Sequence, residues 1–165
     1  MNKKLNKKGL TLSSSKGFTL IEILVVIGII AILAAIVLVA INPARQFAQA
    51  RNTQRVSNVN VILNAISQNV ADNKGVFTCA TYTLIATQTN ISKTAANIRP
   101  CLAPLYVSEI PQDPTASANT CDDAACTTGT YDTKYEVSQD ASGRIKVCAP
   151  STDIPPATVD ICITR

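Results

Sequence analysis

The sequence predicts an α+β protein in which a long N-terminal helix packs against a small antiparallel sheet reinforced by disulfides. Three observations support this fold class. Residues 18–41 are apolar with a single charge, and residues 44–74 carry a helical stripe of apolar side chains. The last part of the chain holds all six cysteines and short strand-like segments separated by turns.

These observations divide the chain into four expected parts. They are a cytoplasmic leader that is removed (1–17), a transmembrane and assembly helix (18–41), its amphipathic continuation (42–74) and an extracytoplasmic globular head (75–165). The head has only about 90 residues, which is small for a self-sufficient core.

The leader holds five of the fifteen basic residues and no acidic one, so ten basic and eleven acidic residues remain after it. The positive-inside rule therefore places the N-terminus in the cytoplasm and the head outside. Because no basic face remains to neutralise phosphates, a nucleic acid is not expected as the main partner.

The apolar segment is long enough to cross a membrane. Its 19 uncharged residues, 23–41, span roughly 28 Å as a helix, close to the ~30 Å of a bilayer core. A secretory signal cleaved near Ala34-Ala35 or Ala40 and a simple membrane anchor are two interpretations. Neither explains Glu22, because a carboxylate near the bilayer centre costs about 2.5–3.5 kcal/mol on insertion scales.

The residues from Gly17 to Glu22 read Gly-Phe-Thr-Leu-Ile-Glu and lead directly into the apolar run. This motif resembles the prepilin signal of type IV pilins and type II secretion pseudopilins. The resemblance implies that a prepilin peptidase cuts between Gly17 and Phe18 on the cytoplasmic side and methylates the new α-amino group of Phe18. Glu22 is then the fifth residue of the mature chain.

The resemblance also implies assembly of the mature chain into a helical homopolymer through its N-terminal helix. The ammonium that cleavage creates at Phe18 can pair with Glu22 of a neighbouring subunit in a low dielectric, which would set the register between subunits. The implied partners are other copies of the chain, prepilin peptidase and a pilus assembly platform in the inner membrane. The implied location is the cytoplasmic membrane for the precursor, then a cell-surface pilus or a periplasmic pseudopilus.

The expected function is therefore that of a structural filament subunit. Two alternatives stay open: a minor pilin or pseudopilin that serves adhesion, DNA uptake or protein secretion, and a membrane-anchored domain that never polymerises. No enzymatic activity and no cofactor are expected, because the chain has no histidine and no glycine-rich phosphate loop.

After the apolar segment, Asn42-Pro43 should kink or interrupt the helix. The pattern then resumes up to Lys74, with Gly75 as the expected C-terminal cap. The apolar stripe of this second helical part consists of Val56, Val59, Ile62, Leu63, Ile66 and Val70.

The head is expected to start with a loop that contains a short helix or strand at 82–87. Pro111 and Pro114 exclude regular structure around them, and this Pro-Gln-Asp-Pro turn is similar to a stretch of major pseudopilins. Segments 130–138 and 143–149 should form an antiparallel hairpin, and 158–164 a third strand. These strands should cover the apolar stripe.

An even number of cysteines in a small domain that follows a membrane segment predicts disulfides formed in an oxidising compartment. Proximity along the chain favours Cys79 with Cys101, Cys121 with Cys126, and Cys148 with Cys162. Buried free thiols are the alternative. A zinc site is not expected, because there is no histidine and no cysteine pair separated by only two residues.

Four carboxylates surround the Cys121 to Cys126 loop: Asp113, Asp122, Asp123 and Asp132. Oxygen ligands of this kind make the loop a weak candidate for calcium. A solvated acidic loop is the favoured interpretation, so no metal is expected.

Overall fold

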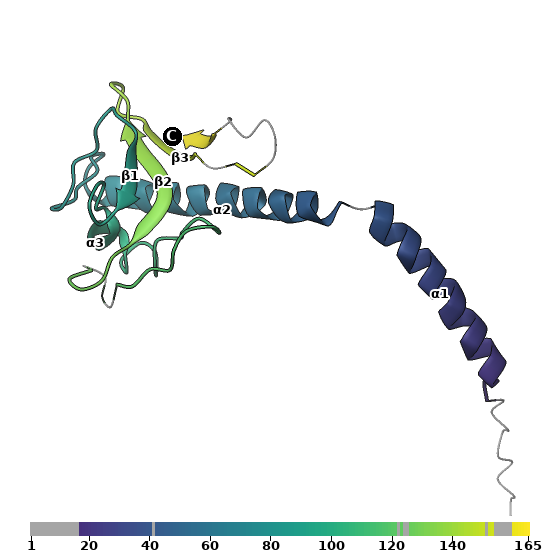
Figure 1. Ribbon diagram of the computed structural model, residues 1–165. Coiled ribbons are helices and arrows are strands. Elements are labelled where there is room, and N and C mark those ends of the chain that lie inside the picture. The colour runs from purple at the N-terminus through teal and green to yellow at the C-terminus, as the bar shows by residue number, and fades with distance from the viewer. Residues whose placement is uncertain (1–16, 41, 122, 124–125, 151, 154–159) are drawn as a thin grey trace, which may run out of the picture. The chain divides into compact units, whose positions relative to one another are not determined.

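The computed structural model describes residues 17–40, 42–121, 123, 126–150, 152–153 and 160–165 (Figure 1). The chain forms two compact units, an N-terminal unit that ends at Asn42 and a head unit from Pro43 to Arg165. The α+β layout, with a long apolar helix, an antiparallel sheet and three disulfides, is confirmed.

The N-terminal unit contains one helix, α1, from Leu20 to Ala40. Its stretch Leu20–Leu38 has a mean hydropathy of 3.2, which is the composition of a membrane span. Asn42-Pro43 was expected to kink or interrupt the helix, and an interruption is what the structure has. Helix α1 ends at Ala40 and a separate helix starts at Pro43, because proline has no N–H to donate and is suited to the first turn.

Helix α2, Pro43–Asp72, is the central element of the head unit. Val59, Ile62, Leu63 and Ile66 of the expected stripe are fully buried, where the helix packs against β3 (Ile145–Ala149) and β4 (Ile161–Thr164). Val56 was expected in the same stripe, but it is 41% exposed. The buried part of the expected apolar stripe therefore begins at Val59, and the buried residues Arg55 and Asn58 before it make polar contacts instead.

The C-terminus of α2 is closed by two residues with left-handed backbone conformations. Lys74 has φ 59° and Gly75 has φ 90°, and the Gly75 N–H donates to the Val70 carbonyl at 2.8 Å. This six-to-one hydrogen bond is typical of a Schellman motif, in which the first left-handed residue is Lys74 rather than the expected Gly75.

The sheet is antiparallel, with the strand order β1-β2-β3-β4 (Figure 1). Strand β1 is Thr89–Ser92 and β2 is Asp132–Gln139. In the register, Gln139 pairs with Ile145, and Val147 pairs with Ile163. The inward side chains of Tyr135, Val137 and Val147 are buried against α2 and complete the core.

Several expected boundaries in the head were wrong. Residues 82–87 form neither helix nor strand; the regular elements of this region are β1 and a one-turn helix α3, Arg99–Leu102. Strand β2 covers 132–139 and not 130–138. Strand β3 starts at Ile145 and not at 143, because the turn uses residues 140–144, with Gly143 at φ 84° and its N–H donating to the Asp140 carbonyl. Strand β4 starts at Ile161; residues 158–159 of the expected strand lie outside the described residues.

The disulfides link Cys79 to Cys101, Cys121 to Cys126 and Cys148 to Cys162, the three pairs that proximity along the chain favoured. The last of these bonds joins directly paired residues of β3 and β4. The first anchors the loop after α2 to α3. The stretch around Pro111 and Pro114 has no helix or strand, as expected.

Candidate functional site

The expected cleavage position lies just before α1. Gly17 and Phe18 precede the first helical residue, Leu20, and the Phe18 side chain is 82% exposed. A Cβ on Gly17 would meet no atom within 4 Å. The fold therefore imposes no steric need for glycine here, so a requirement for glycine at this position would come from the enzyme that reads it.

Glu22 is the only charged residue of α1, and it lies in the first turn of the helix. Its Oε2 atom accepts hydrogen bonds from the Thr19 backbone N–H and the Thr19 hydroxyl, both at 3.0 Å. In return, the Glu22 N–H donates to the Thr19 Oγ1 at 3.2 Å. This reciprocal arrangement is a capping box, and it satisfies two backbone donors that the helix start would otherwise leave without partners.

Thr19 is a site residue that the sequence reasoning missed. The sequence pattern that indicates it was present, because a threonine three residues before a glutamate at the start of an apolar run is the signature of a capping box. The Glu22 carboxylate is thus already bound within its own chain. Its negative charge also lies at the positive end of the helix dipole, which stabilises it there.

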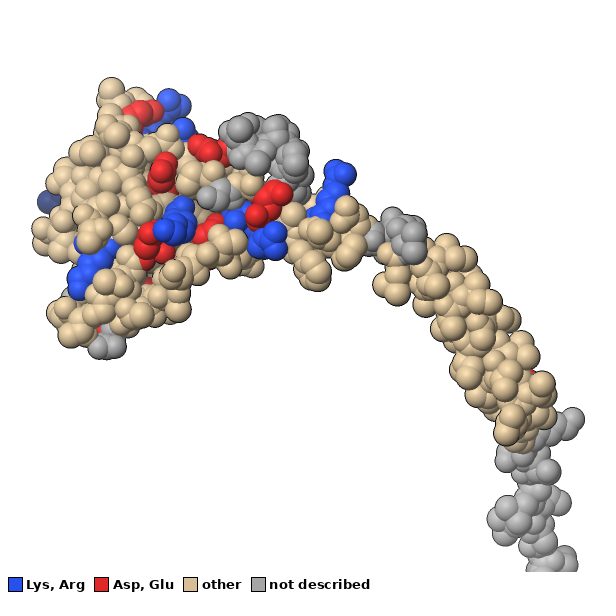
Figure 2. Space-filling model, viewed as in Figure 1, with Lys and Arg blue, Asp and Glu red and all other residues tan. Residues whose placement is uncertain are grey.

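The surface of α1 is apolar on all sides. Its large side chains are about half exposed or more, from Val25 at 49% to Leu20 at 82%. Figure 2 shows almost no charge on the visible face of this helix, while acidic and basic side chains are interspersed over the head. A helix that is apolar all round must be covered by lipid or by other helices.

A buried arginine of α2, Arg55, forms ion pairs with two other segments of the head. Arg55 of α2 and Asp113 of the proline-rich turn each have side chains that are 1% exposed. The Arg55 guanidinium donates to both carboxylate oxygens of Asp113, at 2.5 and 3.1 Å, and to Oδ2 of Asp153 at 2.5 Å. Arg51 donates to the same Asp153 oxygen at 2.7 Å.

The charges in this cluster stabilise one another. The hydrogen bonds that Arg55 donates to Asp113 raise the pKa of Arg55 above its ordinary value. Burial acts to raise the pKa of Asp113, but the bonds from Arg55 and Thr115 outweigh it, and the pKa lies below its ordinary value. Both groups are therefore ionised at neutral pH. The cluster thus holds the segments that contain Asp113 and Asp153 against α2.

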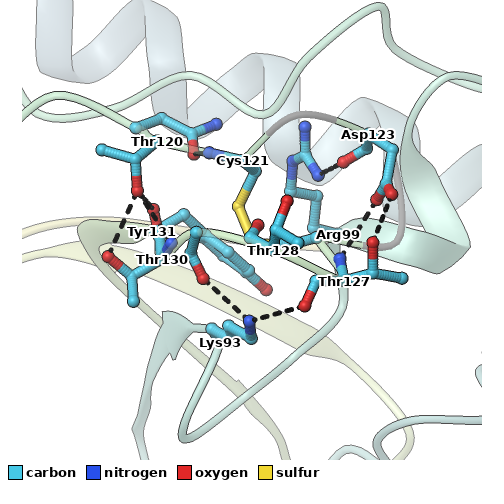
Figure 3. Close-up of a disulfide and its surroundings, with 12 residues drawn as sticks. Lys93, Arg99, Thr120, Cys121, Asp123, Thr127, Thr128, Thr130 and Tyr131 are labelled. Atoms are coloured by element: carbon cyan, nitrogen blue, oxygen red, sulfur yellow. Dashed lines mark hydrogen bonds between the residues drawn. A yellow bond between two sulfur atoms is a disulfide. The ribbon is translucent and has the colours of Figure 1, made fainter.

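The Cys121–Cys126 loop and the residues directly after it are held by two cations from other segments, Arg99 and Lys93 (Figure 3). Arg99 of α3 pairs with Glu109, with its Nη2 at 2.6 Å from Oε2, and it also donates to the Asp123 carbonyl. Lys93 donates to the Gly129 carbonyl at 2.8 Å. The carbonyl groups near this disulfide are thus bound by side chains of the protein itself.

The acidic residues proposed for calcium have separate partners. Asp113 binds Arg55, the Asp132 Oδ2 is 2.5 Å from the Lys134 Nζ, and Asp123 accepts a hydrogen bond from the Thr127 hydroxyl. Asp122 lies outside the described residues. Within the described part of the chain, no three His, Cys, Asp or Glu side chains are grouped so that they could hold a metal ion.

Comparison with protein families gives one match. The family model of the prokaryotic N-terminal methylation motif matches residues 12–38, which identifies this segment as the prepilin signal found in type IV pilins and pseudopilins. The match implies processing by prepilin peptidase, and with the apolar helix α1 it supports membrane anchoring of the precursor. Proteins with this signal are generally structural rather than enzymatic. Comparison with curated proteins and with solved structures gives no match.

Proposed function

We propose that this chain, which carries the prepilin signal at residues 12–38, is a structural subunit of a type IV pilus-like filament. The precursor is inserted in the cytoplasmic membrane with its N-terminus inside. A prepilin peptidase cuts it between Gly17 and Phe18 and methylates the amino group of Phe18. The mature chain then polymerises through α1 on an assembly platform in the inner membrane.

The observation that carries this proposal is the position of Glu22 at the start of a helix that is apolar on every side. Neighbouring copies of such a helix cover one another's apolar surfaces. The carboxylate then lies where a cation on another subunit can reach it, and in a low dielectric that attraction is much stronger than in water. Cleavage supplies the cation as the new ammonium group of Phe18.

The leader prevents this contact in the precursor. Before cleavage the nitrogen of Phe18 is an uncharged amide, and a segment with five lysines precedes it. Removing the segment creates the ammonium and frees the space around it in a single step. Processing thus converts a membrane-stored subunit into one that can assemble.

Two substitutions of Glu22 test the mechanism, since they separate its charge from its capping role. Glu22→Ala removes both, whereas Glu22→Gln keeps an oxygen that can accept the bonds from Thr19 and loses only the charge. We expect both variants to be processed normally and to form few or no filaments, as seen by electron microscopy of sheared surface material. Asp160→Ala, which removes an exposed carboxylate of the head, should assemble like the wild type.

Normal filaments from Glu22→Gln would show that the charge is not used and would overturn the ion-pair mechanism. The cleavage is tested separately, by intact mass and N-terminal sequencing of the mature protein. We expect a chain that begins at methylated Phe18, and a retained leader in Gly17→Leu. A mature chain that starts elsewhere would overturn the assignment of the cut.

A further inference from the structure

The outer face of the sheet has a polar hollow of about 390 Å³, away from the side that packs on α2. Three of its residues form a row across neighbouring strands, since Ser138 of β2 pairs with Lys146 of β3, which pairs with Thr164 of β4. The hairpin turn and the segment before β1 supply the rest of the wall. The polar residues that line the hollow are Gln88, Ser138, Asp140, Arg144, Lys146 and Thr164.

The charges around the hollow add up to a net positive charge. Arg144 is held in place, because its Nε donates to Asp140 Oδ2 at 2.9 Å and to the Ser142 hydroxyl at 3.2 Å. Hydrogen bonds, the strongest from Ser142, lower the pKa of Asp140 to about 2, so that carboxylate stays ionised. Lys146 has no ion pair or side-chain hydrogen bond within the described part of the chain.

A hydroxyl of the sheet also opens into the hollow. The residue Ser138 is only 6% exposed, and its side chain makes no hydrogen bond to any described residue. The Ser138 Oγ atom is not among the described side-chain atoms that are both closed off from solvent and without a partner, so it stays accessible from the hollow. Its position on the wall of the hollow leaves it available to a bound molecule.

We propose that this hollow binds a small ligand that carries an oxyanion, either a carboxylate or a phosphate. The Lys146 ammonium and the terminal nitrogens of Arg144 supply donors for its oxygens, and Ser138, opposite Lys146 in the sheet, supplies a hydroxyl on the same wall. Hydrogen bonds from charged donors to such oxygens are the stronger kind. None of the described residues that line the hollow is aromatic, so they offer a neutral sugar or a base no ring on which to stack.

The test is calorimetric titration of the full chain in detergent micelles with three probes. Inorganic phosphate and glucuronate carry the two oxyanions, and glucose is the uncharged control. We expect at least one of the anions to bind, with an affinity that falls as ionic strength rises. The anion that binds more tightly identifies the source of the ligand. Binding of neither anion, or equal binding of glucose, would overturn the proposal.

A matched pair of substitutions tests whether the anion binds in this hollow. Lys146→Gln should weaken binding about ten-fold or more, the usual size of a lost charge-assisted hydrogen bond. Lys74→Gln removes a lysine that does not line the hollow and should bind like the wild type. If Lys146→Gln melts at a lower temperature than the wild type, Arg144→Gln replaces it. Equal affinities in all variants would overturn the site, and neither result depends on filament assembly.

Discussion

Replacing Arg55 with methionine should destabilise the head far more than any nearby surface change. Methionine keeps much of the side-chain volume but removes the guanidinium that binds Asp113 and Asp153. The Asp113 carboxylate, whose side chain is 1% exposed, would then be buried without its countercharge. That carboxylate would keep only the hydrogen bonds from Thr115.

The expected magnitude follows from the burial of both partners. Breaking a buried ion pair by removing one partner costs about 3–5 kcal/mol, because the remaining charge has lost its solvation and its partner. A small domain has a free energy of unfolding of about 5–15 kcal/mol in total. Arg55→Met should therefore remove a large part of the stability of the head.

Arg51→Met is the matched control. Arg51 lies one turn earlier on α2 and binds the same Asp153, but its side chain is 38% exposed and that of Asp153 is 25% exposed. Exposed pairs of this kind contribute about 0–1 kcal/mol. Urea unfolding of the full chain in mild detergent, followed by near-ultraviolet circular dichroism of the tyrosines, measures both variants. Equal losses in Arg55→Met and Arg51→Met would refute the reasoning.

A double substitution tests the cause of the loss. Asp113→Asn keeps an oxygen for the Thr115 bonds but has no charge to leave unpaired. We therefore expect Arg55→Met combined with Asp113→Asn to be more stable than Arg55→Met alone. Strictly additive losses would mean that the two side chains act independently, against the contacts at 2.5 and 3.1 Å.

Three further predictions concern acid, disulfides and the helix start. The pKa of Asp113 in the folded protein lies below its ordinary value of 3.8. Its contribution to the free energy of unfolding is therefore present above pH 3.8 and is lost as the pH falls through the folded pKa. When urea midpoints are measured at decreasing pH, those of Asp113→Asn should fall less steeply than those of the wild type. Replacing Cys79 and Cys101 by serine removes a disulfide between residues 22 positions apart and should lower the free energy of unfolding by about 3.4 kcal/mol. Replacing Cys121 and Cys126, which are 5 positions apart, should lower it by about 2 kcal/mol. The reverse order in urea unfolding would contradict the loop-entropy argument. Thr19→Val should weaken the start of α1 by about 1 kcal/mol, seen as faster amide exchange in its first turn only; unchanged exchange would mean that the capping box adds no stability.

The fold could be predicted where local pattern decides the structure. The run from Leu20 to Ala40 contains no proline and a single glycine, Gly28, and becomes one helix, and Pro43 separates it from the next. The two strand-like segments on either side of the turn around 139–143 likewise predicted the hairpin of β2 and β3. In these stretches, local preference and tertiary packing favour the same structure.

The missed elements depend on contacts between distant parts of the chain. Strand β1 has the sequence Thr-Asn-Ile-Ser, which has little strand character alone and becomes a strand through pairing with β2. Arg55 and Asp113 are separated by 58 positions, so nothing local indicated that they meet. Thr19, by contrast, was within reach of sequence reasoning, because its spacing from Glu22 is a known capping pattern.

The capping box of α1 also bears on whether assembly can be undone. If the single subunit held a bare carboxylate in lipid, entry into a filament would relieve a large cost and would be close to irreversible. The Thr19 bonds lower the free energy of the unassembled chain, so in the proposed filament an ion pair at Glu22 would gain only the difference between two satisfied arrangements. If the chain assembles as proposed, we expect a subunit to be able to leave the filament and return to the membrane intact, so that the same molecules serve repeated rounds of growth and shortening.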